Sequence, residues 1–178
     1  MAFTVQTDTP TAGANAYIAE AFFREYHEDR GTDTTDYDQS AVEAAIIKAT
    51  QYLDVRFEYV GRRIVSDQST EWPRNSAWNS RGDLVTGIPL RVKQATAEYA
   101  LRALTSSLLA DPDRDGTGRA VKSTSETVGP ISERIEYADF KGFELPAYPL
   151  ADQLLISYGL VADTKSIGGL TSGDLVRS

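Results

Sequence analysis

An apolar stripe along one helix constrains the fold of this chain more than any other feature of its sequence. Between residues 42 and 60, apolar side chains recur every three or four positions, at Val42, Ile46, Ala49, Leu53, Phe57 and Val60. This spacing places them on one face of a helix. Ser40 and Glu43 match a capping box at its start, and Gly61 suits its end. Because such a stripe must be covered by other elements, we expect a helical core around it.

Hydrophobic periodicity and helix-terminal signals predict further helices on both sides of this one. They are expected over residues 16–30, from Pro89 to a stop before Asp111, and from Pro149 onward through Leu150, Leu154 and Leu155. The helix that begins at Pro89 is apolar on more than one side, so we expect it to be central. A short strand is predicted over residues 2–7.

The spacing of apolar residues changes to two after residue 118. Segments 121–128 and 131–137 flank Gly129-Pro130, which is typical of a β-hairpin. The predicted fold is therefore mainly α: a small helical bundle over residues 1–159 with an appended hairpin at about 119–139. Residues 160–178 are rich in Gly, Ser and Thr with spaced leucines, and we expect an extended, flexible C-terminal tail that orders on a partner.

Charge is unevenly distributed over the 178 residues, which carry a net charge of −8. Acidic residues dominate the first 45 positions, whereas basic residues outnumber acidic ones between Lys48 and Arg102. The contrast fits either head-to-tail contacts between copies or a solvated acidic face. A free-standing nucleic-acid binder usually has a basic surface. No apolar run is long enough for a membrane span, so no membrane partner is expected.

No group of residues indicates catalysis, so we expect neither an enzyme nor a cofactor. The chain has no cysteine, which excludes disulfides and Cys-based zinc sites. The only histidine, His27, is expected on a solvated helix face. Asp111, Asp113 and Asp115 match three positions of a calcium-binding EF-hand loop, but Lys122 stands where a glutamate is required. An acidic turn is therefore expected there, with weak calcium binding left open.

Both tryptophans lie in a polar loop, in the stretch QSTEWPRNSAW at residues 68–78. Two interpretations fit them. They could form a stacking surface for nucleic acid together with the nearby basic residues Arg62, Arg63, Arg74, Arg81, Arg91 and Lys93. The net acidity favours the other interpretation, in which Trp72 packs on the bundle and the arginines are solvated or pair with acids.

Several segments in order resemble a known family. GRR…QSTEWPR (Gly61 to Arg74), IPLRVKQATAEYALRAL (Ile88 to Leu104), VGPI (Val128 to Ile131) and YPLADQLL (Tyr148 to Leu155) are similar to small head–tail connector, or adaptor, proteins of tailed bacteriophages. Some members are labelled DnaT-like single-stranded-DNA-binding proteins. The resemblance implies a structural virion protein of the neck, made in the host cytoplasm. The alternative function is that of a DnaT-like single-stranded-DNA-binding replication accessory protein.

The resemblance also implies partners and residue roles. A connector forms a ring, expected to be a dodecamer, between the portal protein and a stopper or tail-terminator protein, and genomic DNA passes through its lumen without sequence-specific binding. In the crossing between the central helices, Trp72 would be a buried anchor and Pro73 would fix the backbone, while Arg74 would point outward to an acid. Predicted subunit or partner contacts are Arg74, Trp78, Leu160, Ile167, Leu170 and Leu175.

Overall fold

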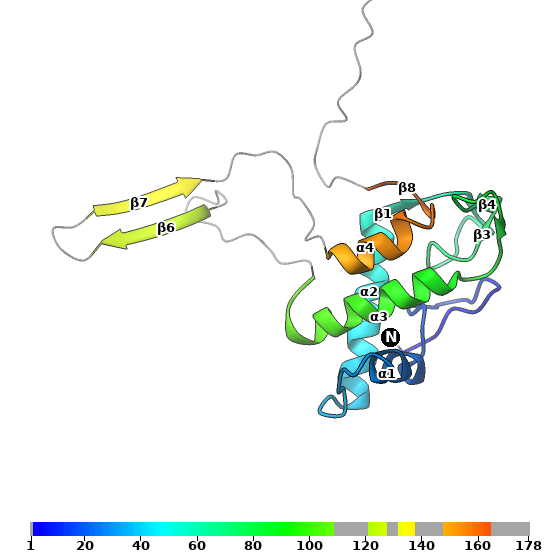
Figure 1. Cartoon of the computed structure of the whole chain (residues 1–178), viewed down its shortest axis with the longest axis horizontal. Helices are drawn as coiled ribbons and strands as arrows, with labels where there is room; N and C mark the ends of the chain where they lie inside the picture. Colours follow the sequence, from blue (N-terminus) through cyan, green and yellow to red (C-terminus); the bar gives the residue numbers. More distant parts are fainter. Residues whose placement is uncertain (1, 109–120, 128–131, 138–147, 165–178) are drawn as a thin grey trace, which may run out of the picture. The chain divides into compact units, whose positions relative to one another are not determined.

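The computed structural model describes residues 2–108, 121–127, 132–137 and 148–164 (Figure 1). Four helices occupy these residues: α1 (Glu20–Glu28), α2 (Gln39–Arg56), α3 (Leu90–Thr105) and α4 (Pro149–Ile156). Antiparallel strand pairs accompany them, so the predicted mainly α fold with an appended hairpin is confirmed. Within the described ranges, no helix is both long enough and apolar enough to cross a membrane.

The predicted hairpin is present as β6 (Val121–Thr127) and β7 (Ser132–Tyr137), within a residue of the expected bounds. The two strands pair antiparallel from Val121 opposite Tyr137 to Thr127 opposite Ser132. This hairpin belongs to a unit separate from the helices, and the remainder of the description concerns the helical unit.

The core of the helical unit is the interface of α2 with α3, with α4 covering α3 (Figure 1). Along α2 the stripe residues Val42, Ile46, Ala49 and Leu53 are fully buried. On α3, Val92 and Tyr99 are fully buried as well, which makes this helix central as expected. Burial of such a stripe against a second helix is the main source of stability for an amphipathic helix.

A buried ionic contact joins three helices across this core. The Arg56 guanidinium of α2 donates to the Asp152 carboxylate of α4 at 2.8 Å, and the Tyr99 hydroxyl of α3 donates to the same carboxylate. Because both charged side chains are almost entirely buried, each depends on the other for compensation. The contact therefore fixes where α4 lies on α2 and α3.

Helix α2 differs from its prediction at both ends. Its cap is Asp38, whose carboxylate accepts a hydrogen bond from the Ala41 amide at 2.7 Å, so the predicted Ser40–Glu43 capping box does not form. The helix ends at Arg56 rather than at Val60. Phe57 begins strand β1 (Phe57–Tyr59), whose side chains alternate between buried and exposed. Pairing with a strand from the far end of the chain replaces the last helical turn.

That partner strand corrects the predicted start of the C-terminal tail. Strand β8 (Val161–Thr164) pairs antiparallel with β1, and the Leu160 side chain is fully buried. The helical unit thus extends beyond residue 159, and Leu160 is a core residue rather than an accessible partner contact. Ile167, Leu170 and Leu175 lie outside the described residues.

The position of His27 was also predicted wrongly. Its side chain is only 2% exposed, and its Nε2 lies 3.0 Å from the carbonyl oxygen of Ala97 on α3. Phe23 and Tyr26 pack edge-on against the imidazole. Phe23 and His27 are four residues apart and share the face with which α1 contacts α3. Burial lowers the pKa of His27, since the charged imidazolium loses its hydration.

This burial predicts a pH dependence of stability. The pKa of His27 in the folded state lies below its ordinary value of 6.5, so the unfolded chain binds a proton more readily than the folded one. Stability therefore falls as the pH drops through 6.5 toward the folded-state pKa. The neighbouring Glu98 carboxylate opposes the shift, whereas Arg30 and Arg102 reinforce it. Urea unfolding at pH 7.5 and 5.5 measures the effect. We expect His27→Gln to lose less stability than the wild type between these pH values, and equal losses would contradict the assignment.

Candidate functional site

The crossing from α2 to α3 is a folded segment built from two short antiparallel ladders. The first pairs β2 (Arg62–Arg63) with β3 (Arg74–Asn75), and the second pairs β4 (Ala77–Trp78) with β5 (Leu84–Val85). Gly61 packs against the bend between the ladders, since a Cβ at this position would lie 2.6 Å from the Asn75 carbonyl oxygen. The two ladders therefore form one connected structure.

Trp72 holds this structure in the core. Its side chain is fully buried, and its indole packs edge-to-face against the Tyr59 ring, with centroids 5.7 Å apart. The Trp72 amide donates to the Tyr17 hydroxyl at 3.1 Å, and that hydroxyl donates to the Asp54 carboxylate. Burial raises the pKa of Tyr17 well above its ordinary value, and the Asp54 charge reinforces the rise. Pro73 is buried beside Trp72.

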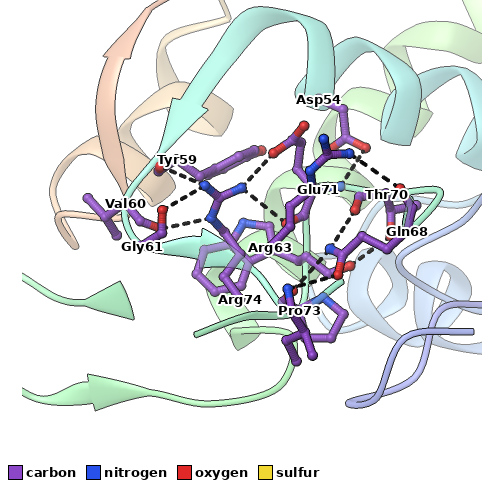
Figure 2. Close-up of polar contacts among 12 residues, drawn as sticks. Asp54, Tyr59, Val60, Gly61, Arg63, Gln68, Thr70, Glu71, Pro73 and Arg74 are labelled. Atoms are coloured by element: carbon purple, nitrogen blue, oxygen red, sulfur yellow. Dashed lines mark hydrogen bonds and ion pairs between the residues drawn. The ribbon is translucent and has the colours of Figure 1, made fainter. Parts of the chain in front are cut away.

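Arg74 points inward, which corrects its predicted outward orientation (Figure 2). Its guanidinium donates to three backbone carbonyls at the end of β1 and in the turn after it, at 3.2 Å to Tyr59, 2.8 Å to Val60 and 2.9 Å to Gly61. The acid with which it pairs is Glu71, three residues earlier in the same chain, at 2.5 Å. These carbonyls and Glu71 occupy the Arg74 guanidinium, so it is not a free contact for another molecule.

The buried side chain of Gln68 holds the exposed loop at residues 62–67 through hydrogen bonds (Figure 2). Its buried amide donates to the carbonyls of Thr70 at 2.7 Å and Pro73 at 3.1 Å. Its Oε1 accepts hydrogen bonds from the amides of Ile64 at 3.1 Å and Val65 at 3.4 Å. One buried side chain thus organises residues 62–67, all of which are exposed.

The second ladder presents Trp78 outward. Trp78 and Leu84 are directly opposite each other in the register, and their side chains are 55% and 52% exposed. The turn between them is closed by Asn79, whose Oδ1 accepts hydrogen bonds from the amides of Arg81 and Asp83, each at 2.9 Å. We use the name hairpin surface for the exposed arginines and large apolar residues of both loops: Arg62, Arg63, Ile64, Val65, Trp78, Arg81 and Leu84. The same loops also expose the acids Asp67 and Asp83.

The arginines of the hairpin surface are available to an anionic partner. Among the described residues, Arg62, Arg63 and Arg81 form no ion pair with a carboxylate, unlike Arg24, Arg56, Arg74 and Arg102. Residues 62–93 contain six basic and three acidic side chains, against a net negative charge for the whole chain. The surface therefore combines unpaired cations with an exposed indole.

A metal site gains no support from the part of the chain that the structure describes. No group of three or more His, Cys, Asp or Glu side chains there is arranged to hold a metal ion. Asp111, Asp113 and Asp115 lie outside the described residues, so the calcium prediction stays a prediction.

Comparison with known proteins gives one match. The model of a family described as "Putative DnaT-like ssDNA binding protein" matches residues 1–178. No curated protein and no solved structure matches the chain. The matched description corresponds to the alternative function considered from the sequence. The predicted head–tail connector of a virion, with its portal, ring and stopper partners and a lumen that DNA crosses unbound, is therefore wrong.

The contrast between the two tryptophans gives a stability prediction. Trp72→Ala removes a fully buried indole and should lower the free energy of unfolding by ~3–5 kcal/mol. Trp78→Ala truncates a half-exposed side chain and should change it by less than about 1 kcal/mol. Urea denaturation of both variants measures the difference, and similar losses would show that the two environments are wrongly assigned.

Proposed function

The chain belongs to the family of putative DnaT-like ssDNA-binding proteins, and from this membership we propose that it binds single-stranded DNA through the hairpin surface. In this proposal it acts as a replication accessory protein by binding alone, without a catalytic step. The observation that carries the proposal is the exposure of Trp78 in the same crossing as Arg62, Arg63 and Arg81, which form no ion pair with a carboxylate among the described residues.

Trp78 supplies the stacking contact. Stacking of a base on an aromatic side chain contributes ~1–3 kcal/mol and tolerates any base, because every base has a π face. The chain has only two tryptophans, and Trp72 is buried. In a duplex the bases are already stacked on one another, so an exposed indole favours unpaired bases. Leu84, directly opposite Trp78, widens the apolar platform.

Arg62, Arg63 and Arg81 supply the phosphate contacts. Each arginine that neutralises a phosphate of a single strand releases a counterion and adds ~0.7 to the salt-dependence slope. Three such contacts give a slope of about −2 in a plot of log affinity against log salt concentration. Binding should therefore be moderate and salt-sensitive.

The overall acidity of the chain is compatible with this proposal. Acidic residues concentrate in the first 45 positions, whereas the hairpin surface lies in the basic segment. At physiological salt, charges more than ~8 Å apart across solvent are largely screened. The phosphates would therefore respond mainly to the local charges, in which Arg62, Arg63 and Arg81 outnumber the exposed Asp67 and Asp83. Repulsion from the acidic part would oppose wrapping of the strand around the whole protein.

Fluorescence anisotropy with a labelled oligothymidylate and a matched duplex tests the proposal. We expect the single strand to bind more tightly than the duplex at low salt. Trp78→Ala should weaken single-strand binding by about 5- to 150-fold, and the double variant Arg62→Gln/Arg63→Gln should reduce the salt slope by about 1.4. Lys48→Gln is the matched control, because Lys48 is an exposed cation on α2 outside the hairpin surface.

Two results would overturn the proposal. One is the absence of single-strand binding by the wild-type protein at low salt. The other is binding that Lys48→Gln weakens as much as the arginine substitutions do, since this would reflect general charge attraction rather than the hairpin surface.

A further inference from the structure

The turn after α4 is hydrogen-bonded to the turn that connects β4 and β5. The Ser80 amide donates to the Tyr158 carbonyl oxygen at 3.0 Å, and the Ser80 hydroxyl lies 3.4 Å from the Ser157 carbonyl oxygen. Gly159 has a φ of +71°, and a Cβ there would lie 2.6 Å from the Ser80 nitrogen. Any larger residue would force the two loops apart. Residues far apart in sequence are thereby held in direct backbone contact.

This contact brings the backbone of a second aromatic residue, Tyr158, near that of Trp78. Ser80 is two residues from Trp78, a backbone span of at most ~7 Å. Because the Ser80 amide is hydrogen-bonded to the Tyr158 carbonyl, the Cα atoms that carry the indole and the phenol lie within about 12 Å of each other. Side chains carried at this separation can contact nucleotides of the same strand. The Tyr158 side chain is half-buried, so part of its ring is accessible.

The guanidinium of Arg91 lies over the Tyr158 ring. The guanidinium carbon of Arg91, near the start of α3, lies 6.0 Å from the centroid of the Tyr158 ring. Arg91 is exposed, and among the described residues its guanidinium donates one hydrogen bond, to the Gln94 Oε1 at 3.1 Å. The cation–π contact orients the guanidinium, and its other N–H groups can donate to a phosphate.

We propose that Tyr158 and Arg91 form a second nucleotide position next to Trp78. Tyr158 stacks one base and Arg91 binds an adjacent phosphate, so the site takes at least two consecutive unpaired nucleotides of one strand. This inference rests on the proposed single-stranded-DNA binding and deepens it. It assigns a role to α3 and to the turn after α4, neither of which belongs to the hairpin surface.

Anisotropy titrations with oligothymidylates of increasing length test the second position. Tyr158→Ala should weaken binding of the longer oligonucleotides by about tenfold, whereas Tyr158→Phe, which keeps the ring, should bind like the wild type. Arg91→Gln should reduce the salt slope by about 0.7. Lys48→Gln again serves as the control for loss of one exposed cation.

The outcomes separate this inference from the proposed function. If the wild type binds no single strand, the proposed function fails and the second position with it. If Trp78→Ala weakens binding but Tyr158→Ala and Arg91→Gln leave affinity and slope unchanged, only the second position is overturned. If Tyr158→Ala lowers the melting temperature, its effect on binding cannot be separated from its effect on folding. The test then rests on Arg91→Gln, because the Arg91 side chain is exposed, and an unchanged salt slope for this variant refutes the inference.

Discussion

Burial of Trp72 is the constraint on which the crossing between α2 and α3 depends. The indole occupies the core, and its amide is tied through Tyr17 to Asp54 on α2. With the middle of the segment held inside, the flanking residues reach the surface in two short ladders. The exposed positions of Trp78 and of the loop at residues 62–67 therefore follow from what Trp72 buries. A rigid core contact thus presents residues for binding.

The arginines of the chain divide by environment into structural and available ones. Arg74 saturates carbonyls of a turn, and Arg56 is compensated by Asp152 in the core. Both have internal partners that a ligand would have to replace at a cost in desolvation. Arg62, Arg81 and Arg91 are exposed, so a phosphate could approach them without breaking an ion pair within the described structure. Residue type alone does not distinguish the two groups.

Local patterns in the sequence predicted the local elements. The α2 stripe, the hairpin of β6 and β7, and Pro149 at the start of α4 each depend on neighbours within a few residues. The errors arose from distant contacts. Pairing of β1 with β8 ended α2 early, and the carbonyls after β1 drew Arg74 inward. The four-residue spacing of Phe23 and His27 was a signal that His27 faces the core. The motifs fitted two functional descriptions, and the connector was the wrong choice.

The pairing of β1 with β8 has a consequence for synthesis of the chain on the ribosome. β1 ends at Tyr59, but its partner begins at Val161, about a hundred positions later. Until that strand emerges, β1 has an open edge and the pocket for Leu160 is empty, and such edges favour association with other nascent chains. The helical unit can therefore close only late in translation, and a polypeptide that stops before Leu160 lacks the piece that closes it.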